Sequence, residues 1–238
     1  MLKKALLATM LVFCTTGFCS NMHAADAASL TPKQENIVLV SAWTAQGNLP
    51  ALKQAFNKAL NDGVTVNELK EVSIQMYAYS GFPRSLNALN TLLTVIDERK
   101  TAGIKDAEGK TAAKPDPKRN RHSIGTAIQT ELVGRPVAGR VYDFSPEIDS
   151  FLKEHLFCDI FERDVLNYQE RELATVSALA ALGNVNAQLA SHYNVSLNVG
   201  LSIEQLEEAV KLLKYHVGSE VGNNADNVLR KVLHNKNR

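Results

Sequence analysis

The sequence contains one long segment twice, and this duplication constrains the fold more than any other feature. Leu30 opens the first copy and Leu166 opens the second. Identity between the copies is low, but several glycines keep their places, and glycine often marks a backbone conformation that other residues avoid. A unit of this length that occurs only twice indicates a duplicated domain rather than a solenoid. The matching pairs include Ser41 and Ser177, Gly47 and Gly183, Gly63 and Gly200, Glu71 and Glu208, and Gly81 and Gly218.

Both copies are predicted to be helical. Thr31, Pro32 and Gln34 supply an N-cap, a proline at the first helical position and the second member of a capping box. Apolar residues then follow at helical spacing, and helix ends or breaks are expected at Gly63 and Gly81. No segment shows the sustained alternation of a β-strand. The predicted fold class is therefore all-α, with two tandem copies of a helical repeat.

The chain divides into four predicted parts. Residues 1–25 have the basic start, short apolar run and alanine-rich end of a signal peptide. Residues 30–99 form the first repeat, and residues 145–235 form a lead-in helix followed by the second repeat. Between the repeats, residues 100–144 are rich in Gly, Lys, Asp and Pro, which predicts a solvated and partly mobile polar connector.

Net charge and cysteine content bear on two classes of function. Removal of Lys3 and Lys4 with the signal peptide changes the formal net charge from +1 to −1, which gives no reason to expect nucleic-acid binding. The same cleavage leaves Cys158 as the only cysteine. A two-cysteine redox cycle within one subunit is therefore excluded. No apolar stretch in the mature chain could span a membrane.

The residues of these repeats resemble the carboxymuconolactone decarboxylase family, which shares an AhpD-like fold with an alkyl hydroperoxide reductase accessory protein. The resemblance covers most of the mature chain, and its pieces stand in the family's order. They are the Arg171-Glu172 helix start, Ala180 to Gly183, His192, Gly200-Leu201-Ser202, the Tyr79 to Pro83 turn, and the lead-in helix from His155 to Phe161.

The redox branch of this family carries two cysteines three residues apart, followed four residues later by a histidine. With His192 as that histidine, the matching positions here hold Val185 and Gln188. In the first copy, Phe56 stands at the place of His192, and leucines stand at the cysteine positions. Peroxiredoxin-type activity is therefore implied by the fold but opposed by the missing cysteine pair.

The resemblance implies decarboxylation without a metal or organic cofactor. His192 is the candidate proton donor and Glu172 its carboxylate partner, because a carboxylate that orients an imidazole is a workable acid/base arrangement. Each also has a structural interpretation: His192 as a core histidine, and Glu172 as a carboxylate at the positive end of its helix. The candidate catalytic residues are His192, Glu172 and, as a secondary choice, His216, and the candidate substrate-binding residues are Gln188, Tyr79 and Trp43.

The expected protein is exported, acts on a small carboxylated lactone-like molecule and forms a homo-oligomer. Relatives with one copy assemble as rings of six, so a two-copy chain would form a trimer. Three alternatives stay open: a residual peroxidase-type activity, a non-enzymatic binding or assembly protein, and a different acid/base reaction such as isomerisation or lactone hydrolysis. The two copies differ in their polar residues, so any chemistry is expected to centre on the second copy.

Overall fold

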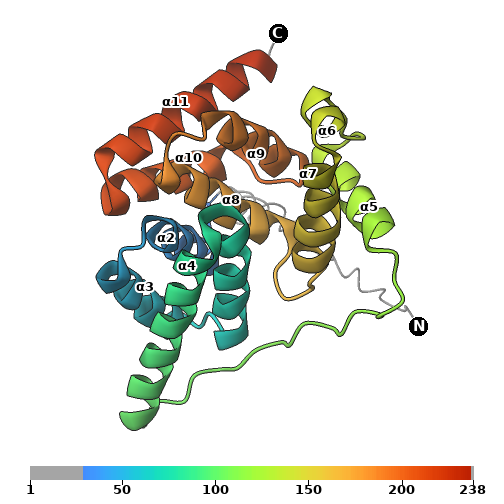
Figure 1. Cartoon of the computed structure of the whole chain (residues 1–238). Coiled ribbons are helices and arrows are strands. Elements are labelled where there is room, and N and C mark those ends of the chain that lie inside the picture. The colour runs from blue at the N-terminus through green and yellow to red at the C-terminus, as the bar shows by residue number, and fades with distance from the viewer. Residues whose placement is uncertain (1–28, 237–238) are drawn as a thin grey trace, which may run out of the picture.

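A computed structural model describes residues 29–236 of the chain, and every regular element in this range is a helix (Figure 1). The prediction of an all-α fold is confirmed. The predicted signal peptide lies outside the described residues. The elements are α2 (Pro32–Gln46), α3 (Leu49–Asn61), α4 (Val66–Thr101), α5 (Arg121–Val133), α6 (Arg140–Phe144), α7 (Pro146–Ser150), the π-helix η1 (Phe151–Phe161), α8 (Tyr168–Leu182), α9 (Asn186–Asn198), α10 (Ile203–Leu212), the π-helix η2 (Leu213–Val217) and α11 (Ser219–Lys236).

The centre of the molecule is the pair α2 and α8, which are the first helices of the two copies. Each has 15 residues and begins with a capping box, from Thr31 with Gln34 in α2 and from Asn167 with Glu170 in α8. The two helices pack side by side (Figure 1). All residues from 170 to 180 are buried, as expected for a helix that is enclosed by others on every side.

The remaining helices of the copies follow the same plan. Helices α3 and α9 have 13 residues each. In the first copy α4 is interrupted at Gly81, whose φ of 83° and ψ of 159° are available to glycine and strained for other residues. In the second copy the corresponding helix is interrupted at Gly218, between η2 and α11. The break predicted at Gly81 therefore occurs as a kink within one long element.

The interval after α4 is exposed but held at several points. It runs as an extended segment across the molecule to α5 (Figure 1). Arg99 binds Asp106 through two nitrogens at 2.7–3.1 Å, and the backbone N–H of Val66 donates to the Ala107 carbonyl at 2.9 Å. Further along, Asp164 accepts a hydrogen bond from the Ala113 N–H at 2.9 Å. These contacts hold the connector against the first copy near Ala107 and against the segment that follows η1 near Ala113.

A helix inside the predicted connector was not expected from composition. Helix α5 packs against η1 and buries Ile128 and Leu132 in a second, smaller apolar cluster with Leu156 and Phe161. The prediction of a solvated segment through residues 100–144 is therefore wrong for this helix. The apolar residues of α5 lie four apart and cover one narrow face of the helix. They are too few to change the polar average composition of the whole interval.

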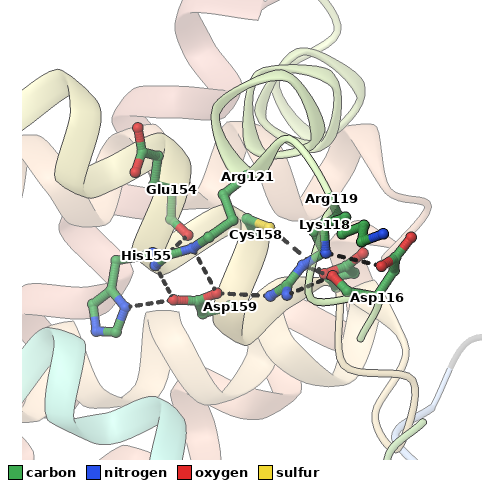
Figure 2. A network of polar contacts seen from close by, with 9 residues as sticks. Asp116, Lys118, Arg119, Arg121, Glu154, His155, Cys158 and Asp159 are labelled. Carbon is green, nitrogen blue, oxygen red and sulfur yellow. Dashed lines mark hydrogen bonds and ion pairs between the residues drawn. The ribbon is translucent and has the colours of Figure 1, made fainter. Parts of the chain in front are cut away.

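Charged side chains hold the start of α5 against η1. Asp159 accepts hydrogen bonds from Arg119 at 2.9 Å and from Arg121 at 3.1 Å, and its other oxygen lies 3.0 Å from Nδ1 of His155 (Figure 2). His155 and Asp159 lie one helical turn apart on η1 and form a surface pair. Cys158 is buried beside this network.

Replacing Gly125 with alanine is expected to lower the free energy of unfolding by about 1–3 kcal/mol. A Cβ added at Gly125 would lie 1.6 Å from the Lys153 carbonyl oxygen, so α5 and η1 would have to separate. Thermal unfolding of Gly125→Ala measures the effect. The control is Ala127→Ser at an exposed position of the same helix, where a change within about 0.5 kcal/mol is expected. Equal melting temperatures for the two variants would mean that the close approach of α5 to η1 does not stabilise the fold.

Candidate functional site

A cavity of about 530 Å³ lies where the first copy, the connector and the second copy meet. Its walls are mostly apolar, and its polar groups are few. The residues that line it come from α4, from α5 and the segment after it, from η1 and from α8 and α9. They include Tyr79, Gln129, Leu132, Arg135, Tyr142, Leu152, Leu156, Phe157, Glu172, Gln188, His192 and Val195. A partly open, largely apolar space with a few convergent polar groups is typical of a small-molecule site.

Glu172 and His192 form a close pair in this cavity. Nδ1 of His192 lies 2.8 Å from Oε2 of Glu172. The Glu172 side chain is 1% exposed and the His192 side chain is 18% exposed. The carboxylate is therefore buried behind the ring, while the ring reaches the cavity. This contact places the proton of the neutral imidazole on Nδ1 and leaves Nε2 available to a ligand.

Tyr79 brings a third polar group to the pair from the first copy. Its ring meets the His192 ring edge-on, with the centroids 5.6 Å apart. The Tyr79 hydroxyl and Oε1 of Glu172 are both buried without a hydrogen-bond partner among the described residues. Burial raises the pKa of Tyr79 well above its usual range, and the charge of Glu172 raises it further. Tyr79 therefore stays protonated, and its buried hydroxyl faces the polar groups of α8 rather than the open space of the cavity.

The neighbour of Glu172 has a different task. Arg171 is fully buried and extends toward α4, where it donates to the Gln75 side chain at 3.0 Å and to the Arg163 carbonyl at 2.7 Å. Burial lowers the pKa of Arg171, and the carboxylate of Glu71 opposes this change. Two consecutive residues of α8 therefore have different roles. Arg171 joins the second copy to the first, and Glu172 contributes its carboxylate to the cavity wall.

The comparison with known protein families agrees with this arrangement. The model of the carboxymuconolactone decarboxylase family matches residues 15–93 and 146–231. The chain belongs to the carboxymuconolactone decarboxylase family. The two matched regions support the two-copy arrangement, with Tyr79 in the first region and Glu172 and His192 in the second. A 4-carboxymuconolactone decarboxylase of Acinetobacter baylyi is 24% identical over 117 residues, which cover 48% of this chain and 87% of that protein.

Four of the six predicted site residues line the cavity of this family member. They are Tyr79, Glu172, Gln188 and His192. His216 lies elsewhere, exposed on η2 with its ring against Tyr215. Trp43 packs against the main apolar core and does not line the cavity. The structure therefore brings the first four residues together and leaves His216 and Trp43 outside.

Part of the cavity wall comes from the interval between the two stretches that match the family model, and this part was not predicted from the sequence. Gln129, Arg135 and Tyr142 all line the cavity, and all belong to the interval that was expected to be a connector. The signal that could have revealed α5 is the spacing of Ile124, Ile128 and Leu132, which places three apolar side chains on one helical face. No comparable pattern marks Arg135 or Tyr142.

None of the described residues that line the cavity carries a thiol. The lone cysteine of residues 29–236, Cys158, is buried on another side of η1, with its sulfur 3.6 Å from Oε2 of Glu162. Burial raises the pKa of the Cys158 thiol, which disfavours the reactive thiolate. Within the same residues, no three side chains are grouped as metal ligands would be. No helix of this part of the chain has the length and apolar character needed to cross a membrane.

Proposed function

We propose that this protein decarboxylates a small carboxylated lactone, with His192 as the proton donor and no bound cofactor. The observation that carries the proposal is the contact of 2.8 Å between His192 and the buried Glu172 at the wall of the cavity. The name of the Acinetobacter relative adds 4-carboxymuconolactone as the first substrate to try.

The proposed reaction breaks one bond in the substrate and needs one proton from the protein. The bond between the ring carbon and the leaving carboxylate breaks, CO₂ departs, and the electron pair remains on the substrate as an enolate spread toward the lactone carbonyl. The protonated imidazole of His192 then transfers one proton to carbon, which completes the exchange of CO₂ for hydrogen. Glu172 orients the ring and compensates its positive charge while it is protonated. Solvent returns the proton to His192 afterwards.

Tyr79 and the apolar walls support the same step. The Tyr79 ring meets the His192 ring edge-on, and this contact helps to hold the imidazole in place for proton transfer. The pKa of Tyr79 is raised, so its hydroxyl keeps its proton and adds no second negative charge beside Glu172. Leu152, Leu156 and Phe157 give the same space an apolar wall. An apolar setting disfavours a localised carboxylate charge more than the dispersed charge that replaces it.

Two other activities remain as alternatives. A different acid/base reaction, such as isomerisation or lactone hydrolysis, could use the same pair of residues. A thiol-based peroxidase activity is opposed by the buried Cys158 and by the absence of cysteine from the cavity. We also propose that the protein is exported after removal of residues 1–25 and forms a homotrimer. The exposed Phe82, Leu86 and Leu93 on the second half of α4 support self-association.

Incubation of the purified protein with 4-carboxymuconolactone is expected to release one CO₂ for each lactone consumed. Cys158→Ser should release CO₂ at an unchanged rate, because the reaction uses no thiol. Gas release and product analysis distinguish the alternatives, since neither isomerisation nor hydrolysis forms CO₂. Consumption of the lactone without CO₂, or a thiol-dependent peroxide reduction that Cys158→Ser abolishes, would contradict the proposal.

A further inference from the structure

Among the described residues that line the cavity, Arg135 is the one side chain of permanent positive charge. The other charged or chargeable groups that line it include Glu172 and His192, which are occupied with each other. Arg135 is exposed, and among the described residues it makes no hydrogen bond or ion pair. A planar guanidinium without a partner at the edge of an apolar cavity is well suited to bind a carboxylate with two parallel hydrogen bonds.

The position of Arg135 is set by contacts with the helix that carries His192. Helix α5 ends at Gly134, whose φ of 78° turns the chain out of the helix immediately before Arg135. The Asn198 side chain at the end of α9 donates hydrogen bonds to the carbonyls of Glu131 and Leu132 at 3.1 and 2.8 Å. The end of α5, and with it Arg135, is therefore tied to α9, which also holds His192.

The chemistry of decarboxylation indicates which carboxylate Arg135 would bind. Holding the carboxylate that leaves would stabilise its charge in the ground state and would slow the loss of CO₂. Holding a second carboxylate, which stays on the product, adds binding energy without opposing the reaction. A muconolactone already carries an acetate group, so its 4-carboxy derivative has both kinds of carboxylate.

We propose that Arg135 selects substrates with a second carboxylate by binding the group that the product retains. This inference rests on the proposed function. Arg135 lies outside both regions that match the family model, in the interval between residues 93 and 146. The substrate preference of this protein thus comes from a segment that joins the copies, while the proton donor comes from the shared family core.

The test compares Arg135→Gln with the unaltered protein. With 4-carboxymuconolactone, the variant is expected to show a rise in KM of about ten- to a hundredfold and a kcat within about threefold of the original, as for the loss of a hydrogen bond to a charged group. Arg135→Lys should restore part of the affinity. Arg140→Gln is the matched control, because Arg140 is exposed on α6 nearby and does not line the cavity.

A second measurement separates this inference from the proposed reaction. Muconolactone keeps the acetate but lacks the carboxylate that leaves, so it binds without being decarboxylated. Titration calorimetry should show binding of muconolactone to the unaltered protein, with an affinity lower by about ten- to a hundredfold in Arg135→Gln. Two results would overturn the role of Arg135 but not the proposed reaction. They are equal affinities of the unaltered protein and Arg135→Gln for muconolactone, and an unchanged KM in an Arg135→Gln variant that still releases CO₂. Arg135-dependent binding in a protein that releases no CO₂ would overturn the reaction and leave carboxylate recognition standing.

Discussion

Replacement of His192 by asparagine is expected to reduce kcat for CO₂ release by about 10²–10⁴-fold, the usual contribution of a positioned general acid. The amide nitrogen of the new side chain would take the place of Nδ1, which lies 2.8 Å from Glu172 in the unaltered protein, and could still donate to this carboxylate. The buried carboxylate would therefore keep a partner, and the fold should remain close to the original. An amide N–H is far too weakly acidic to transfer its proton to carbon, so the chemical step is lost while the pocket is preserved.

His216→Asn is the matched control for this experiment. His216 is exposed on η2 and lies outside the cavity, so its replacement should leave kcat, KM and the melting temperature unchanged. Steady-state kinetics and thermal unfolding of both variants decide between a chemical and a structural role. If His192→Asn keeps full activity but melts at a lower temperature, His192 is a structural residue and the proposed mechanism is wrong.

Removal of the Glu71 carboxylate is expected to lower the free energy of unfolding by about 3–5 kcal/mol, because it leaves a buried positive charge without a partner. Glu71 is 4% exposed and binds Arg163 through two nitrogens at 2.6–3.1 Å. Its second oxygen also lies 3.5 Å from the guanidinium of the fully buried Arg171. These contacts join α4 of the first copy to the start of the second copy, so their loss weakens the contact between the copies.

Denaturant unfolding of Glu71→Ala measures this change. Glu98→Ala serves as control, because Glu98 pairs with Lys53 at 2.6 Å on the surface, where both side chains are about half exposed. Loss of that pair should change the free energy of unfolding by less than about 1 kcal/mol. Similar stabilities for the two variants would show that Arg171 does not depend on Glu71 for its charge balance.

Much of the fold could be predicted from the sequence because its signals are local. The capping box at Thr31 and Gln34 and the helix break at Gly81 depend on residues within a few positions of each other. The duplication then extended the prediction from one copy to the other. The pair formed by Glu172 and His192 could also be predicted, because the resemblance to the family singled out both residues.

The composition of the site could not be predicted in the same way. Tyr79 and His192 belong to different copies and meet only because α2 and α8 pack together at the centre of the molecule. Helix α5 supplies another part of the cavity wall. Its short apolar face could not be recognised from the sequence because the interval around it has a polar composition.

The sequence by itself therefore determined the capped helices of the two copies, because caps, glycines and periodicity act over a few residues, and its resemblance to the family singled out Glu172 and His192 as the candidate acid/base pair. Only the tertiary structure decided that Tyr79 and Arg135 share a cavity with His192 while His216 stays at the surface. The physical reason is that convergence depends on packing between helices distant in sequence, and such packing is set by many weak contacts summed over the whole core.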